Sequence, residues 1–322
     1  MLSIGRLTIA SSLVLAPMAG ISDLPFRLLN RSYGCEFAFT EMISVNALVR
    51  SNKNTLNMLA ANSEDRPLGI QILGNDPEVI KRAMDILRGY AFDLIDFNAA
   101  CPAKKVVTCG EGAALLREPS RMQKLLKAIV SNTDLPVTIK IRSGWNETSV
   151  NAVEIGLVAQ DAGVSGLFIH GRTRIQGYSG SVNYNIIRQV KEALAIPVIG
   201  SGDALSPVLI KRMFDETGCD GVAVARGSFG NPWIFRETTG YLQNRILHAR
   251  PGLSERAEAM KAHLDLLISA YGEENGVVFF RKFYAWYSKG LPAKRLRQQA
   301  FQAAAKDEML HLIRALEDLK TV

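Results

Sequence analysis

Short apolar runs alternate with helical stretches along the first 230 residues of the chain. Eight of these runs are rich in β-prone residues, and several are apolar at every position, as parallel strands buried between helices must be. Their starts lie 24 to 43 residues apart, which leaves room for a crossover helix in every interval. The pattern predicts an α/β fold, a (β/α)₈ TIM barrel. The predicted strands are residues 13–17, 37–42, 68–73, 94–98, 137–141, 166–170, 197–201 and 221–225.

An open, Rossmann-like doubly wound sheet is the alternative fold. Such sheets commonly bind nucleotides through a glycine-rich loop. Neither GEGAAL (110–115) nor GSGDAL (200–205) completes the GxGxxG pattern, and no GxxxxGK[ST] phosphate loop occurs. The barrel is therefore favoured.

The pattern changes after GNPWIF (230–235), and the rest of the chain shows only helical periodicity. Met260, Leu264, Leu267 and Tyr271 recur at spacings of three and four. Turn signals near Gly252, Gly272, Gly290 and Asp307 divide this part into about four helices. We expect a barrel domain over residues 1–240 and a small C-terminal all-α helical bundle over residues 241–322.

Composition is that of an ordinary globular protein, with 48% hydrophobic and 21% charged residues in a chain of 322. The four cysteines show no CxxC spacing and the four histidines are isolated, so we expect neither a disulfide framework nor a metal site. No apolar run reaches the roughly 18 residues that a spanning helix needs. We expect a cytoplasmic monomer with no membrane contact and no obligate protein partner.

The charge excess is local. The formal net charge is +7, and residues 275–306 contain seven basic and no acidic residues, so the rest of the chain is formally neutral. Aromatics alternate with these cations, which suits contact with an RNA backbone combined with stacking on bases. An amphipathic helix with a solvated charged face is the alternative. The cations are Arg281, Lys282, Lys289, Lys294, Arg295, Arg297 and Lys306.

Polar side chains gather where the predicted strands end, the face at which barrel enzymes place their sites. Gln71 and Lys140 lie inside strands and would be costly to bury without partners. A flavin would supply them, because its pyrimidine edge can pair with an amide and its reduced form is stabilised by a cation. Glycines after the last two strands allow a phosphate to approach the backbone.

Each of these residues also has a simpler interpretation. Lys140 could extend to the rim, Gln71 could satisfy a loop, and His170 could be structural. A lone Cys101 is commonly a small buried hydrophobe, although it follows a strand end and precedes a proline. Asn98 could hold a ligand or cap the turn.

Several motifs, in order along the chain, resemble those of the tRNA-dihydrouridine synthases, most closely the bacterial B-type branch. The helical stretch Trp286–Gly290 continues the resemblance. The motifs are LAPMAGISDLPFR (15–27), QILG (71–74), NAACPAKKV (98–106), GAALLREP (112–119), KIRSGW (140–145), HGRTR (170–174), GSGD (200–203) and GNPWIF (230–235).

The resemblance implies an FMN enzyme that uses NADPH to reduce the C5–C6 double bond of particular uridines in tRNA. Cys101 would donate the proton to C5 while flavin N5 delivers hydride to C6. The implied cofactor-binding residues are Pro17, Met18, Ala19, Gln71, Lys140, His170, Ser201, Gly202, Asp203, Ala225 and Arg226.

Four positions depart from the family's usual residues. Ala100 and Ala225 replace glycines, Ser201 replaces an asparagine of the phosphate loop, and Phe283 replaces a histidine of the helical domain. A serine can still donate or accept a hydrogen bond, and a backbone N–H survives where φ is negative. We therefore expect activity to persist.

A uridine inside folded tRNA must be turned out to reach such a site, and a positive surface must hold the surrounding phosphates. A small-molecule flavin enzyme of the dihydroorotate dehydrogenase type, or a non-catalytic RNA-binding protein, would share only part of these features. Lys104 and Lys105 are expected to point toward RNA and away from Cys101. The expected RNA-binding residues are Asn98, Lys104, Lys105, Arg142, Arg172, Arg174, Arg281, Lys282, Lys289, Lys294, Arg295 and Arg297.

Overall fold

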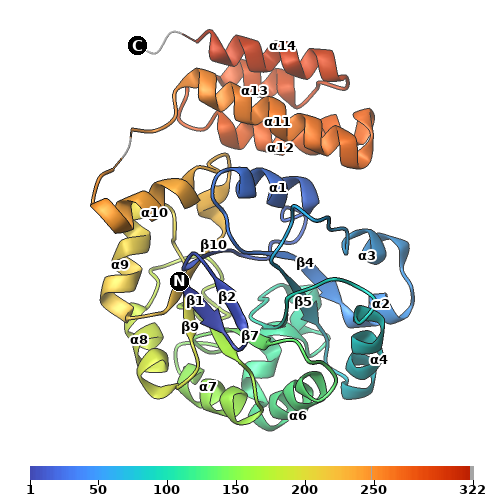
Figure 1. Cartoon of the computed structure of the whole chain (residues 1–322), viewed down its shortest axis with the longest axis vertical. Coiled ribbons are helices and arrows are strands. Elements are labelled where there is room, and N and C mark those ends of the chain that lie inside the picture. Colours follow the sequence, from blue (N-terminus) through green and yellow to red (C-terminus); the bar gives the residue numbers. More distant parts are fainter. Residues whose placement is uncertain (248, 320–322) are drawn as a thin grey trace.

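The computed structural model describes residues 1–247 and 249–319 and contains a closed barrel of eight parallel strands (Figure 1). Each strand pairs with the next along the chain, and the last closes on the first. The predicted barrel is confirmed, with every predicted strand present within a few residues. The strands are β3 (Leu13–Leu15), β4 (Ala38–Ser44), β5 (Leu68–Leu73), β6 (Leu94–Ala99), β7 (Val137–Arg142), β8 (Gly166–His170), β9 (Val198–Ser201) and β10 (Gly221–Val224).

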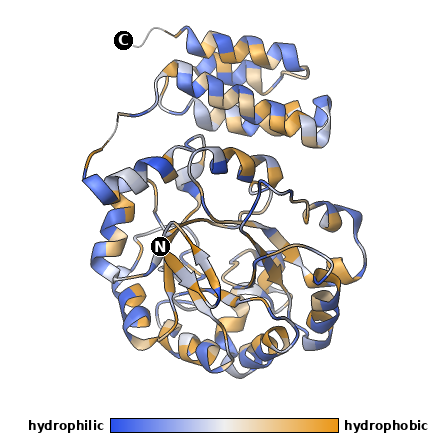
Figure 2. Ribbon diagram, viewed as in Figure 1, coloured by the Kyte–Doolittle hydropathy of each residue, from blue (hydrophilic) through white to orange (hydrophobic). Residues whose placement is uncertain are grey.

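Helices surround the barrel, with apolar positions toward the strands and polar positions outward (Figure 2). Several begin at an Asp or Ser cap followed by proline, a combination that satisfies free N–H groups and presets φ for the first turn. Ser206, for example, accepts a hydrogen bond from Leu209 N before Pro207. These helices are α1 (Leu24–Ser32), α2 (Val45–Val49), α3 (Lys53–Asn57), α4 (Pro77–Leu87), α5 (Lys104–Val107), α6 (Pro119–Val130), α7 (Ala152–Asp161), α8 (Tyr184–Ala193), α9 (Pro207–Thr217) and α10 (Ile234–Asn244).

An N-terminal hairpin, which we did not predict, covers the amino end of the barrel. Strands β1 (Leu2–Ile4) and β2 (Leu7–Ile9) pair antiparallel, and Leu2, Ile4 and Ile9 are buried against the barrel interior. The sequence does contain a hairpin pattern, because LSI and LTI alternate apolar and polar residues on either side of a two-residue Gly-Arg turn. The hairpin closes one end, so a site can open only at the carboxyl ends of the strands.

Four helices follow residue 249 in the described chain, as predicted: α11 (Leu253–Tyr271), α12 (Glu273–Tyr287), α13 (Lys294–Ala300) and α14 (Lys306–Glu317). They form a bundle beside α1 (Figure 1). Phe26 of α1 stacks on Phe283 of α12, with ring centroids 5.6 Å apart, and contacts His263 of α11. The barrel and the bundle therefore share a buried aromatic core.

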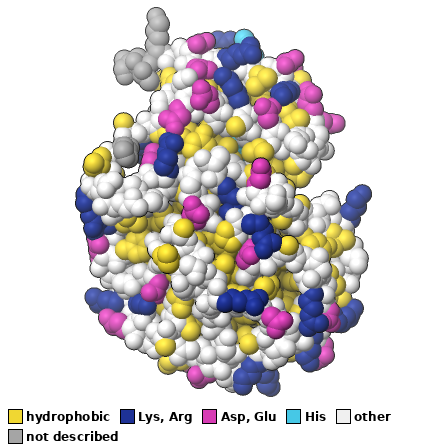
Figure 3. Space-filling view, in the orientation of Figure 1, with side chains coloured by type: hydrophobic (Ala, Val, Ile, Leu, Met, Phe, Trp, Pro, Cys, Tyr) yellow, Lys and Arg dark blue, Asp and Glu magenta, His cyan; other side chains and the backbone are white. Residues whose placement is uncertain are grey.

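Surface charge on the face that carries the hairpin is mixed, with basic and acidic side chains interspersed (Figure 3). No helix of the described residues is both long enough and apolar enough to cross a membrane.

Candidate active site

A cavity of about 450 Å³ opens at the carboxyl ends of the strands. It is lined by residues from the loops after β3, β6, β8, β9 and β10 and by side chains of the strands themselves. Every residue that we expected to bind the cofactor lines it, together with Cys101. The lining includes Pro17, Met18, Ala19, Gln71, Asn98, Cys101, Lys140, Arg142, His170, Ser201, Gly202, Asp203, Ala225 and Arg226.

A chain of buried hydrogen bonds connects the barrel interior to Cys101. Thr138 Oγ1 and Gln71 Nε2 both donate to the carboxylate of Asp96, each at 2.7 Å. Gln71 Oε1 accepts from Asn98 Nδ2 at 2.7 Å, and Asn98 Oδ1 accepts from the backbone N–H of Cys101 at 2.9 Å. An ionised carboxylate only accepts hydrogen bonds, so the amides of Gln71 and Asn98 are held in one orientation each.

Asp96 is a functional candidate that sequence reasoning missed, and it lies beside Lys140. Burial raises the pKa of Asp96 to about 6, although the hydrogen bonds from Gln71 and Thr138 lower it in part. Burial lowers the pKa of Lys140 to about 8, although the charge of Asp96 raises it in part. Each charge therefore favours the ionised form of the other. The signal was one acidic residue in the apolar run LIDFN.

His170 is half-buried beside several cations at the end of β8. Burial and these positive charges lower its pKa to about 2, so the imidazole is neutral at physiological pH. Its Nδ1 and the Oγ of Ser201 are buried and have no hydrogen-bond partner in the described part of the chain. Buried polar atoms normally have partners. Two unpartnered atoms and the half-buried Lys140 ammonium in one cavity fit a polar, anionic cofactor such as FMN.

The turn after β9 has a left-handed backbone. Gly202 has φ +116° and Asp203 has φ +50°, and a side chain at Gly202 would collide with Val182. The carboxylate of Asp203 accepts from Arg172 Nη2 at 2.6 Å and from Arg226 Nη2 at 3.0 Å. This ion-pair network fixes the turn that lies beside the predicted phosphate position.

The departures from the family pattern are accommodated. Ala225 has φ −115°, and Ala100 also lacks a positive φ, so neither position requires the left-handed conformation that favours glycine. Phe283 is buried in the core shared with α1. Ser201 presents its free Oγ to the cavity.

The Cys101 loop is held from both sides. Arg142 Nε donates to the carbonyl of Ala100 at 2.7 Å, and Ala113 N donates to the carbonyl of Cys101 at 3.1 Å. Gly112 has φ +58°, and a Cβ there would lie 2.9 Å from the Cys101 carbonyl oxygen, so the close contact requires glycine. The Cys101 side chain stays partly exposed at the cavity mouth.

The basic residues proposed for RNA divide into two groups. Lys104, Lys105, Lys289, Lys294 and Arg295 are exposed. The charged groups of the others contact other parts of the protein. Arg142 donates to Thr173 O, Arg172 pairs with Asp203, Arg174 covers the Trp145 ring, Arg281 donates to Ala303 O, Lys282 donates to Gly20 O, and Arg297 donates to Ser288 O.

Tyr178 is a second residue that sequence reasoning missed. It lines the cavity and is 62% exposed, and the guanidinium groups of Arg142 and Arg226 lie 5.5 and 5.4 Å from its ring centroid. An exposed ring held this way offers a flat surface at the entrance. Its only sequence signal was an aromatic residue in a polar, glycine-containing loop.

Comparison with known proteins identifies the relatives of the chain. The family model described as dihydrouridine synthase (Dus) matches residues 14–321. The tRNA-dihydrouridine synthase B of Pasteurella multocida is 37% identical, over 96% of this chain and 94% of its own length. The enzyme of the same name from Xanthomonas campestris pv. campestris is 39% identical, over 90% and 88%.

Solved structures show the same barrel at low sequence identity. Histamine dehydrogenase from Rhizobium sp. 4-9 matches with a TM-score of 0.58 and 14% identity, over 82% of this chain and 50% of that one. Morphinone reductase matches with a TM-score of 0.52 and 12% identity, over 78% and 90%. These likenesses support the fold.

Proposed function

The chain belongs to the dihydrouridine synthase family, and from this premise we propose how it works as a tRNA-dihydrouridine synthase. It is an oxidoreductase that converts uridine in tRNA to dihydrouridine, with FMN in the barrel cavity, NADPH as the reductant and Cys101 as the proton donor. The observation that carries this proposal is the convergence of Cys101, the Lys140 ammonium and two unpartnered polar atoms on one cavity.

Different residues around the cavity would bind different parts of FMN. Gln71, oriented by Asp96 and Asn98, would pair with the pyrimidine edge of the ring, and Lys140 would place its positive charge there. His170 Nδ1 and Ser201 Oγ would complete their hydrogen bonding on the cofactor. Arg226 and the turn at Gly202 would receive the phosphate. When bound, FMN supplies the hydride for C6 of the uracil.

The proton for C5 comes from Cys101 in this proposal. The thiol lies on a loop whose backbone is held by Asn98 and by Arg142, so its position at the cavity mouth is preset. A general acid must be positioned and protonated at the operating pH. The C5–C6 double bond is reduced by one hydride and one proton, NADPH is oxidised, and Cys101 is reprotonated from solvent.

The family membership favours this function over the two alternatives that the sequence left open. A small-molecule flavin enzyme would not need the exposed basic residues of the bundle, and a non-catalytic RNA-binding protein would not need the convergent cavity. The exposed residues Lys104, Lys105, Lys289, Lys294 and Arg295 are proposed to contact the tRNA backbone.

Purified protein with bound flavin, assayed on tRNA, tests the assignment. In Cys101→Ala, FMN content and NADPH oxidation should be unchanged, whereas dihydrouridine formation should fall by about 10²-fold or more, the usual contribution of a general acid. Cys109→Ala is the matched control, because Cys109 is an exposed thiol outside the cavity lining. Full turnover on tRNA by Cys101→Ala would overturn the role of the thiol.

A further inference from the structure

One face of helix α12 contacts the barrel next to the cavity. Lys282 and Trp286 are four residues apart and therefore lie on the same side of the helix. Lys282 Nζ donates a hydrogen bond to the carbonyl of Gly20. The Trp286 ring stacks on Phe229, with centroids 4.1 Å apart and planes 10° apart.

Both contacted loops form part of the cavity wall. Gly20 belongs to the loop between β3 and α1, in which residues 17–19 and Ile21 line the cavity. Phe229 belongs to the loop between β10 and α10, and it lines the cavity together with Arg226. Because β10 and β3 are neighbours in the barrel, α12 supports two adjacent loops on one side of the cavity.

The packing between α12 and these loops is close. Gly230 has φ +60°, and a Cβ there would lie 2.4 Å from the carbonyl carbon of Trp286. No side chain fits between the two backbones. Phe283 of the same helix stacks on Phe26 of α1, the helix that follows the first loop. The helix therefore has little freedom to move relative to either loop.

Charge complementarity holds Lys282 at the barrel. The ammonium faces the carboxylates of Asp23 and Glu41, and Glu41 accepts a hydrogen bond from Gly20 N. Tyr271 of α11 donates to Asp23 Oδ2 at 3.0 Å. Burial raises the pKa of both carboxyl groups, and the Lys282 charge lowers it in part. The Lys282 ammonium therefore binds the loop between β3 and α1 and does not extend into solvent to bind a phosphate.

We propose that α12 is a structural part of the cofactor site, in which Lys282 and Trp286 are positioning residues for the two cavity loops. The helical bundle would then contribute to FMN binding as well as to tRNA binding. The inference rests on the proposed function, because it takes FMN to be the occupant of the cavity.

Titration of the flavin-free full-length protein with FMN, followed by quenching of flavin fluorescence, tests the proposal. Lys282→Met should weaken FMN binding by about tenfold or more, because the Gly20 carbonyl loses its donor and the two carboxylates lose the nearby positive charge. Lys282→Arg should restore most of the affinity, since a guanidinium can donate to the same carbonyl. Lys289→Met is the matched control, because it removes one exposed positive charge just after α12 and should leave FMN affinity unchanged.

Amide hydrogen exchange of residues 17–23, measured without FMN, gives an independent reading. In Lys282→Met, residues 17–23 should exchange faster than in the wild type. In Trp286→Leu, residues 225–230 should exchange faster than in the wild type. Normal FMN affinity and normal exchange in Lys282→Met, with tRNA binding weakened as in Lys289→Met, would overturn the proposal and make Lys282 an RNA contact. Failure of the wild type to bind FMN would instead overturn the proposed cofactor.

Discussion

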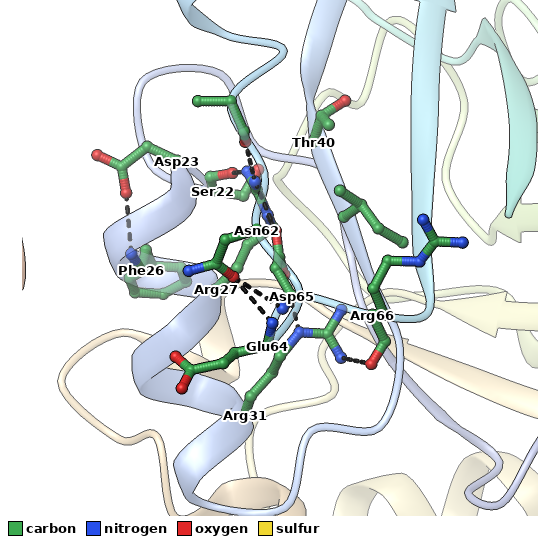
Figure 4. Close-up of polar contacts among 12 residues, drawn as sticks. Ser22, Asp23, Phe26, Arg27, Arg31, Thr40, Asn62, Glu64, Asp65 and Arg66 are labelled. Atoms are coloured by element: carbon green, nitrogen blue, oxygen red, sulfur yellow. Dashed lines mark hydrogen bonds and ion pairs between the residues drawn. The ribbon is translucent and has the colours of Figure 1, made fainter. Parts of the chain in front are cut away.

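Asp65 binds two arginines of α1, Arg27 and Arg31, in a buried cluster between this helix and the loop that precedes β5 (Figure 4). Its carboxylate accepts from Arg27 Nε and from Arg31 Nε, each at 2.8 Å, and is fully buried. Arg27 Nη1 also donates to the carbonyl of Ser22, whose hydroxyl accepts from Met18 N in the cavity wall. The cluster therefore connects the stability of the barrel with the shape of the cavity.

Replacing Asp65 by Asn removes the negative charge with almost no change in volume. One ion pair at about 4 Å is worth about 4 kcal/mol at an effective dielectric constant of 20. Asp65→Asn removes two ion pairs, and the Arg27 side chain is only 1% exposed, so water screens its charge little. The lost attraction is partly offset because the folded protein no longer has to bury a carboxylate charge. Breaking a buried pair by removing one partner costs about 3–5 kcal/mol, and we expect the free energy of unfolding to fall by that amount.

Urea unfolding, monitored by tryptophan fluorescence, measures this effect. With a denaturant slope of about 3 kcal/mol per M, the midpoint should fall by about 1 M or more. Asp85→Asn is the matched control, because Asp85 pairs with Arg88 at 3.1 Å with both side chains more than 60% exposed. That variant should lose less than about 0.5 kcal/mol. The reasoning is refuted if Asp65→Asn and Asp85→Asn unfold within about 1 kcal/mol of each other.

Two further predictions concern pH and salt. Burial lowers the pKa of His263 to about 3, so between pH 6.5 and 3 the unfolded chain binds a proton there that the folded chain does not. As the pH decreases through this window, the wild type should lose about 1.4 kcal/mol of folding stability per pH unit relative to His263→Phe, measured by urea titration; a stability difference that does not change with pH would contradict the shifted pKa. Charge reversal of Lys289, Lys294 and Arg295 together should weaken tRNA binding and reduce the slope of log K against log salt by about 2 to 3. FMN affinity should stay unchanged. The control is Lys127→Glu on α6, which lies on the side of the barrel away from the bundle (Figure 1); an effect per reversed charge equal to that of the triple variant would show that the basic segment is not a specific contact.

Much of the fold and site was predictable because their signals are local. Parallel strands buried between helices are apolar on both faces, so all eight appear as short runs in the sequence. In a barrel, the loops that follow parallel strands meet at one face whatever their spacing in the chain. Gln71, Cys101, Lys140 and His170 could therefore be expected in one cavity before any coordinate was known, and all four line it.

The sequence by itself determined the barrel, the bundle and the residue types that converge at the strand ends. Only the tertiary structure decided which charged groups are free. Lys282, Arg281 and Arg297 lie in a basic segment that suggests RNA contacts, yet each donates to a backbone carbonyl outside its own helix. The physical reason is that a long cationic side chain selects its partner by distance in space, and a carbonyl acceptor has no signature in the sequence. Asp96 shows the same limit, since its partners come from two neighbouring strands whose register exists only in the closed barrel.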